Sequence, residues 1–125
     1  MKKIILDTNF LLIPAQFKID IFSEIDRVSC FNYDLCVLDK TINELKKVVD
    51  EQKGKDKSAA ELALDLVKVK KLRILKTKGD NVDDLLVKQK EAIIATSDKK
   101  LIKKLKNRGI KIIRLRQKKY LKLEE

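Results

Sequence analysis

Four acidic residues stand where an apolar segment gives way to turn or helix-starting residues: Asp7, Glu44, Asp83 and Asp98. Asp7 follows the apolar run at residues 4–6, and Asp98 follows a second run at 92–96. If both runs are buried parallel strands, their carboxyl ends meet at one edge of a sheet, where the ligand sites of open α/β sheets lie. Carboxylates that meet there repel one another unless a cation neutralises them. The positions of the four acids therefore predict a cation site.

The ligand types present in the chain indicate which cation this site would take. The sequence has no histidine and only two cysteines, Cys30 and Cys36, so the spacing of a zinc site is absent. An all-oxygen set of ligands favours Mg²⁺ or Mn²⁺. On a basic protein, such a site suggests phosphodiester hydrolysis, in which metal ions activate water and stabilise the leaving oxygen. We expect the two cysteines to be small buried residues of a protein in the reducing cytoplasm.

Each acid also has a purely structural interpretation. Asp7 can cap the helix that follows it, and Asp98, which stands in the same arrangement, can cap the next helix along the chain after its own strand. Thr41-x-x-Glu44 matches a capping box, in which the glutamate reaches back to a backbone amide. Asp83 and its neighbour Asp84 fall in the first turn of a predicted helix, where the helix dipole favours acids. Because all four acids are predicted to converge on one sheet edge, a shared site explains their positions better than four separate structural roles.

Alternating apolar patterns define the elements that must position these acids. Short β-leaning runs predict five strands, at residues 4–6, 33–38, 72–76, 92–96 and 110–115. Amphipathic segments predict helices between them, at 10–13, 20–28, 39–50, 58–71, 82–91 and 99–107, with a turn at 79–81 and an exposed loop at 50–57. In the 58–71 helix we expect a core stripe of Ala59, Leu62, Leu66 and Val69. This order predicts an α/β fold of three layers around a five-stranded parallel sheet.

Length and charge set the class of protein and of partner. The 125 residues have room for one compact domain, which we expect at 1–116, followed by a basic tail at 117–125 in which Tyr120 is a possible stacking ring. No apolar run approaches the roughly 20 residues of a membrane span, and the first strand begins too early for a signal peptide. The net charge is +11, and residues 99–122 hold 12 Lys or Arg and no acid. Such a one-sided run indicates a nucleic-acid partner rather than a membrane.

Four short motifs together resemble the PIN-domain ribonucleases: LDTN at 6–9, T-x-x-E-L at 41–45, D-D-L-L-V at 83–87 and A-T-x-D at 95–98. The resemblance extends over residues 2–115 and implies a parallel five-stranded sheet between helices, with a Mg²⁺ or Mn²⁺ site at the strand ends. Carried over by motif, the metal-binding and catalytic acids would be Asp7, Glu44, Asp83 and Asp98. Asn9 and Thr96 would orient ligands, water or phosphate. Asp84 adjoins Asp83, and the choice between the two as ligand is open.

One position departs from the family pattern. Many members continue T-x-D-x-D, whereas Lys100 stands at the second acid position. This lysine could bind phosphate or could weaken a second metal, so sites with one ion and with two are both open. The motifs lean toward the branch that processes ribosomal RNA rather than toward the VapC toxins.

The expected function is a metal-dependent endoribonuclease, and the alternative is a non-catalytic RNA-binding or ribosome-assembly module that keeps the PIN fold. The basic side chains expected to contact RNA are Lys99, Lys100, Lys103, Lys104, Arg114 and Arg116. Besides RNA, the resemblance implies as partners a second copy of the chain, and an antitoxin or a ribosome-assembly factor.

Overall fold

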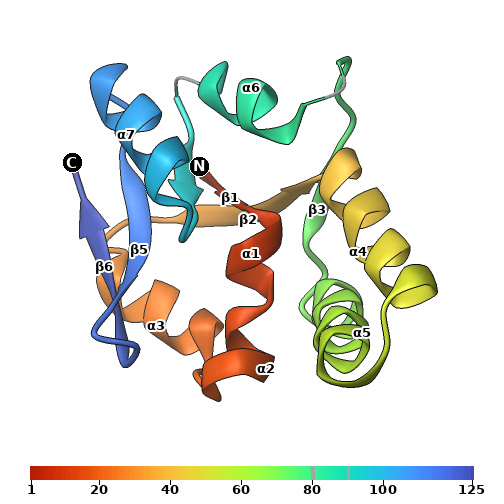
Figure 1. The fold of residues 1–125 in the computed structure, drawn as a ribbon. Coiled ribbons are helices and arrows are strands. Elements are labelled where there is room, and N and C mark those ends of the chain that lie inside the picture. The colour runs from red at the N-terminus through yellow and green to blue at the C-terminus, as the bar shows by residue number, and fades with distance from the viewer. Residues whose placement is uncertain (80, 90) are drawn as a thin grey trace.

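The protein folds around one six-stranded sheet in the order β3-β2-β1-β4-β5-β6, with helices on both faces (Figure 1). This structure, a computed structural model, describes residues 1–79, 81–89 and 91–125. The strands are β1 (Lys2–Leu6), β2 (Tyr33–Leu38), β3 (Arg73–Leu75), β4 (Ile93–Ala95), β5 (Ile112–Arg116) and β6 (Tyr120–Glu124). The helices are α1 (Thr8–Leu11), α2 (Ile13–Phe17), α3 (Ile21–Val28), α4 (Asp39–Glu51), α5 (Gly54–Val69), α6 (Val82–Val87) and α7 (Lys99–Asn107).

Strand β1 lies at the centre of the sheet and pairs in parallel with β2 and β4. Because side chains of a strand alternate between its two faces, β1 contributes to two cores. Ile4 and Leu6 pack in the core under α1 to α5, and Ile5 packs in the core under α6 and α7. The predicted three-layer α/β/α architecture is therefore confirmed, with an apolar strand covered on both faces.

The sheet has a sixth strand in the segment where we expected a basic tail, so the prediction of five parallel strands was incomplete. Strand β6 pairs antiparallel with β5. Leu121 and Leu123 alternate with polar residues and pack into the core under α1 to α5. The turn between the strands places Gln117 and Lys118 at φ values of 52° and 54°, in the left-handed region. Neither residue is a glycine or asparagine, so the usual hairpin signal is absent from the sequence.

Helix α5 differs from its prediction in both its start and its buried face. It begins at Gly54, so the expected loop at 50–57 shrinks to Gln52 and Lys53. Its buried face consists of small residues, namely Ala59, Ala60, Ala63 and Val67. The exposed fractions of Leu62 and Val69 are 40% and 71%, so these two members of the expected stripe do not form the core, whereas its member Ala59 does. Alanines let α5 approach its neighbours closely, which a pattern built on large side chains does not reveal.

Smaller expectations have mixed outcomes. Cys36 is buried as expected, whereas Cys30 is exposed in the connection before β2. Helix α6 ends at Val87, short of the predicted end at 91. The predicted turn at 79–81 includes residue 80, and the predicted helix at 82–91 includes residue 90. Both of these residues lie outside the described ones. Within the described chain, no helix is long and apolar enough to cross a membrane.

Candidate active site

The four acids predicted from the sequence line one pocket of about 270 Å³. Asp7 follows β1 and caps α1, and Asp98 follows β4 by three residues and caps α7. Glu44 comes from α4 and Asp83 from the first turn of α6. These elements meet beyond the carboxyl ends of β1 and β4 (Figure 1). The pocket is completed by Thr8, Asn9, Leu12 and Val82, and Asp84 is not among its lining residues.

Asp7 is the buried member of the set, with an exposed fraction of 5%. Its Oδ2 accepts a hydrogen bond from the Thr96 hydroxyl at 2.7 Å, and its Oδ1 accepts one from the Thr8 amide at 2.8 Å. Burial raises the pKa of Asp7 against these two bonds, and the negative charges of Asp83 and Glu44 act in the same direction as burial, so that the pKa is about 6. The carboxylate is therefore held in place in a setting that penalises its charge, which a nearby cation would relieve.

Asn9 and Thr96, the predicted supporting residues, connect the turn after β1 with the turn after β4. The Thr96 hydroxyl accepts from the Asp98 amide at 3.2 Å, and the Asn9 Oδ1 accepts from the Ser97 amide at 3.1 Å. The Thr96 oxygen also lies 3.4 Å from the Asn9 Oδ1. Because a hydroxyl has one proton to donate, the shorter contact to Asp7 is the bond it makes.

The capping box predicted for Thr41 and Glu44 does not form. Helix α4 begins earlier than that motif requires, with Leu38 at its N-cap. Thr41 therefore lies inside the helix, where its buried hydroxyl has no hydrogen-bond partner among the described residues. The Glu44 Oε1 instead accepts from the Thr8 hydroxyl at 2.9 Å. Of the two interpretations left open, the structure supports the one in which Glu44 points toward Asp7.

Asp98 serves as a cap and as a pocket residue at once. Its Oδ1 accepts from the amides of Lys100 and Leu101 at 2.9 and 3.3 Å. Its charge also acts on Asp83, whose pKa is raised first by burial and then by Asp98, while Lys104 lowers it. In the described part of the chain, no three His, Cys, Asp or Glu residues are grouped so that they could hold one ion. The acids thus surround the pocket and influence one another without forming a closed ligand shell.

The predicted RNA-contacting residues fall into two groups. The lysines of α7 project from a helix whose buried face is Leu101, Ile102 and Leu105. The two arginines lie on β5, where Nη1 of Arg114 and Nη1 of Arg116 are each 3.8 Å from a carboxylate oxygen of Glu124. Neither the arginines nor the lysines of α7 line the acid pocket, but α7 begins directly after the pocket residue Asp98, and the charge of Lys104 acts on Asp83.

Some residues near the pocket carried no sequence signal that singled them out. Thr8 lies in the LDTN motif with no role assigned to it, yet its hydroxyl bonds to Glu44. A second hollow adjoins the pocket and is lined by Lys40, Asn43 and Lys47 of α4. Asn43 and Lys47 lie three and seven residues after Lys40, and this helical spacing was the available signal, since it places them on one helix face.

Comparison with known proteins places this geometry in a family. A model of the PIN-like domain matches residues 4–118. Ribonuclease VapC4 from Methanocaldococcus jannaschii is 32% identical over 129 residues, an alignment that covers 98% of this chain and 97% of that protein. The solved structure of the PIN domain endonuclease Utp24 has a TM-score of 0.76 and 26% identity, covering 98% of this chain and 90% of the other.

A more distant structure, VapBC2 from Rickettsia felis bound to a DNA fragment from its promoter, is similar in fold. Its TM-score is 0.63 at 16% identity, covering 91% of this chain and 99% of the other. PIN-domain nucleases generally use divalent metal ions, and the ribonuclease relative supports a nuclease function. The resemblance read from the four motifs is thereby confirmed: the chain belongs to the PIN-like domain family.

Proposed function

We propose that this protein is a divalent-metal-dependent endoribonuclease that hydrolyses RNA phosphodiester bonds at the pocket of the four acids. The observation that carries the proposal is the convergence of Asp7, Glu44, Asp83 and Asp98, from four separate elements, on one small pocket. Membership of a family that contains ribonucleases supplies the reaction class.

The donor chemistry of the pocket fits Mg²⁺ or Mn²⁺. The four acids offer only oxygen, which these ions prefer, and the raised pKa values of Asp7 and Asp83 mark a place where positive charge is missing. When bound, such an ion would activate water and stabilise charge on the phosphoryl group. Thr96 and Thr8 hold the Asp7 carboxylate in position, and Asn9 fixes the adjoining turn.

The lysines of α7 supply the attraction for RNA in this proposal. They sit on the helix that Asp98 caps, so their charge lies next to the pocket. Phosphate neutralisation by such residues gives affinity without sequence preference. Arg114 and Arg116 share Glu124 with Lys106, whose Nζ is 2.7 Å from that carboxylate, and we assign them a weaker part in RNA binding.

The relatives suggest two biological settings. The VapC4 homologue and the VapBC2 structure favour a toxin-type ribonuclease with an antitoxin partner. The likeness to Utp24 favours a role in ribosome assembly. A gene for a small antitoxin beside the gene for this chain would support the first setting. A homodimer in the cytoplasm remains our expectation in either case.

A non-catalytic RNA-binding module is the second candidate. Two observations favour it: Lys100 replaces an acid that many family members have, and the described acids do not form a closed group that could hold one ion. This candidate predicts RNA binding without any metal-dependent cleavage.

Cleavage of single-stranded RNA in Mn²⁺, Mg²⁺ or EDTA tests the two candidates. We expect cutting only with metal, and its loss in Asp7→Asn, Asp83→Asn and Asp98→Asn. The matched control is Asp84→Asn, which removes the neighbouring acid that does not line the pocket. Tight binding without cutting in any metal would favour the binding module. Cutting that survives in all three pocket variants would mean that the site lies elsewhere.

A further inference from the structure

A second hollow of about 450 Å³ lies between α4 and α6 and adjoins the acid pocket. The two hollows share three lining residues, Glu44, Val82 and Asp83. We call the second hollow the α4–α6 cleft; Figure 1 shows the two helices that border it. Its volume falls in the range of roughly 300–1,000 Å³ that is usual for small-molecule sites. Because the two hollows share lining residues, a ligand held in the cleft would reach the acid pocket directly.

The α4 wall of the cleft is one polar row. Lys40, Asn43, Glu44 and Lys47 are spaced by three, four and seven residues, which places them on one face of the helix. Leu45, between them in sequence, is buried in the core. Seven residues of helix span about 10 Å along its axis, so the two ammonium groups can contact different phosphates of one strand.

The two lysines of this row are not neutralised by the glutamate between them. Glu44 stands four residues after Lys40 and three before Lys47, which is the spacing of helical ion pairs. Its Oε1 is bonded to Thr8 instead. Among the described residues, no carboxylate lies within ion-pair distance of Lys40 or Lys47. Glu44 thus belongs to the acid pocket, and both positive charges remain for a ligand.

The rest of the lining indicates recognition of a base edge rather than of a ring face. Asn43 is exposed, and its carboxamide offers both a hydrogen-bond donor and an acceptor. Among the described residues, no aromatic side chain lines the cleft, so stacking is not the means of binding. A base can present its edge to a carboxamide in this way when it is unpaired.

We propose that the α4–α6 cleft binds the nucleotide of single-stranded RNA next to the phosphodiester that is cleaved. Lys40 and Lys47 hold its flanking phosphates, and Asn43 bonds to the edge of its base. The inference rests on the proposed function, because the acid pocket defines which phosphodiester is cut. In this proposal the RNA contacts helix α4 as well as the lysines of α7.

Binding in EDTA tests the phosphate contacts separately from cleavage. Labelled single-stranded RNA of mixed sequence is titrated with the full chain, with Lys40→Ala/Lys47→Ala, and with Lys46→Ala/Lys68→Ala. The control pair removes the same charge from exposed lysines that do not line the cleft. We expect the cleft pair to weaken binding about tenfold and to reduce the slope of log K against log salt by about 1.4, or about 0.7 for each phosphate contact. Equal losses in the two pairs, or none in the cleft pair, would overturn the proposal.

Sequencing of the cut ends from a randomised RNA tests the base contact. The unmodified chain should favour one base at one position beside the cut, and Asn43→Ala should reduce that preference about tenfold or more. An unchanged profile would remove Asn43 from base recognition. If the cleft variants lose binding while the unmodified chain never cuts, the proposed function fails and only the binding of RNA by the cleft stands. If the chain cuts normally and the cleft variants bind as tightly, the cleft assignment fails alone.

Discussion

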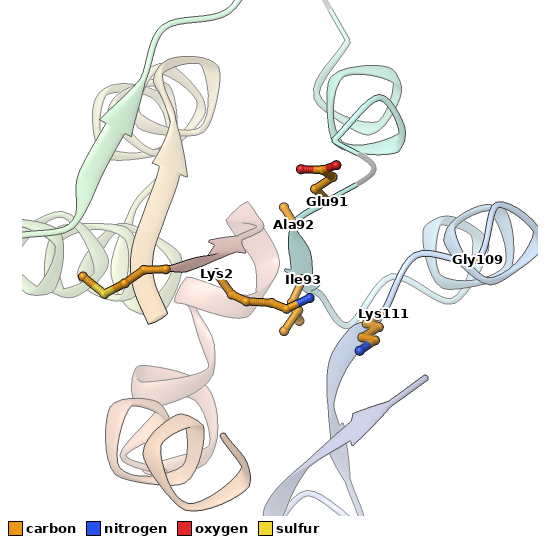
Figure 2. A pocket seen from close by; sticks show the side chains of 7 residues that line it. Lys2, Glu91, Ala92, Ile93, Gly109 and Lys111 are labelled. Atoms are coloured by element: carbon orange, nitrogen blue, oxygen red, sulfur yellow. The ribbon is translucent and has the colours of Figure 1, made fainter. Parts of the chain in front are cut away.

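The two ends of the sheet carry hollows of very different character. At the carboxyl end, the acid pocket has a volume of about 270 Å³. At the amino end, a larger hollow of about 420 Å³ lies around the starts of β1, β4 and β5. Figure 2 shows it: Lys2 reaches from β1 past Ile93, Lys111 stands beside β5, and Glu91 is the one acid among the described residues that line it. The larger hollow is therefore not the one where chemical groups gather.

The difference follows from how the chain enters and leaves a parallel sheet. At the carboxyl end, strands pass into helices whose first turns need capping, so Asp7 and Asp98 arrive there and are tied by Thr96. At the amino end, the described side chains of the hollow make one ion pair, between Lys111 and Glu125 at 3.3 Å. Hydrogen bonds between distant segments, rather than volume, distinguish the acid pocket from the hollow at the amino end.

The largest expected effect is on RNA cleavage, which should depend on the acid at the carboxyl end of the sheet and not on the acid at the amino end. Asp7→Asn should reduce RNA cleavage at least about a hundredfold, since even loss of a group that supports a metal ligand commonly costs ten- to hundredfold. Glu91→Gln, which removes the acid of the amino-end hollow, should cleave like the unmodified chain. Initial rates in Mn²⁺ measure both. Equal losses in the two variants would remove the distinction between the ends.

In the absence of metal, Asp7→Asn should increase the stability of the folded protein at high pH, although the same substitution reduces cleavage. The pKa of Asp7 is raised from 3.8 to about 6 in the folded protein, so the folded state holds this proton more tightly than the unfolded state. The stability that results is complete below about pH 4 and is lost as pH rises through 6, by up to about 3 kcal/mol at pH 8. Asp7→Asn should therefore be more stable than the unmodified chain at pH 8 in EDTA, but not at pH 4.

Urea unfolding at the two pH values measures this effect. The asparagine can keep both local bonds, because its Oδ1 can accept from the Thr8 amide while its Nδ2 donates to the Thr96 hydroxyl. Glu91→Gln is the control and should stay within about 0.5 kcal/mol at both pH values. A destabilisation of Asp7→Asn that is the same at pH 4 and pH 8 would contradict the burial argument.

Removal of the Thr96 hydroxyl should weaken both stability and activity. Thr96→Val keeps the shape of a fully buried side chain but deletes the donor to Asp7, and a hydrogen bond to a charged group contributes about 1.5–3 kcal/mol. We expect a loss of that size at pH 8 and about a tenfold loss of cleavage. Ile93→Val, at the amino end, should cost about 0.5–1.5 kcal/mol and leave cleavage unchanged. Full activity of Thr96→Val would show that the hydroxyl does not position Asp7.

The smallest expected effect concerns single lysines. Lys104→Gln removes a charge that acts on Asp83, and it should lower the salt dependence of RNA binding by about 0.7 in slope. Lys111→Gln removes an equal charge at the amino end and should leave that slope unchanged. Binding isotherms at several salt concentrations measure the difference. Identical slopes for the two variants would mean that RNA does not distinguish the ends of the sheet.

The fold and the acid pocket were largely predictable because their signals are local. Short apolar runs that end in acids, as before Asp7 and Asp98, report burial and position together. Strand β6 was missed because its alternating Leu121 and Leu123 stand among charged residues, after a turn without glycine or asparagine. A basic composition therefore concealed a half-buried edge strand.

The parts that sequence could not supply depend on contacts between distant segments. The direction of Glu44 is decided by Thr8, which lies 36 residues earlier. The buried face of α5 consists of three alanines and Val67, and only the approach of neighbouring elements explains why these small residues form its core. The α4–α6 cleft exists because Asn81 and Val82 of a later segment face α4. None of these follows from the pattern of a single element.

Calorimetric titration with Mn²⁺ tests most directly whether the four acids form one metal site. We predict saturable binding that releases protons increasingly as pH falls toward 6, because Asp7 must lose its proton to bind the ion. Binding should be lost in Asp7→Asn and Asp98→Asn and kept in Glu91→Gln, and the number of ions bound decides between the one-ion and two-ion sites that Lys100 left open. The same Mn²⁺ binding in all four proteins, or none in the unmodified chain, would contradict the account.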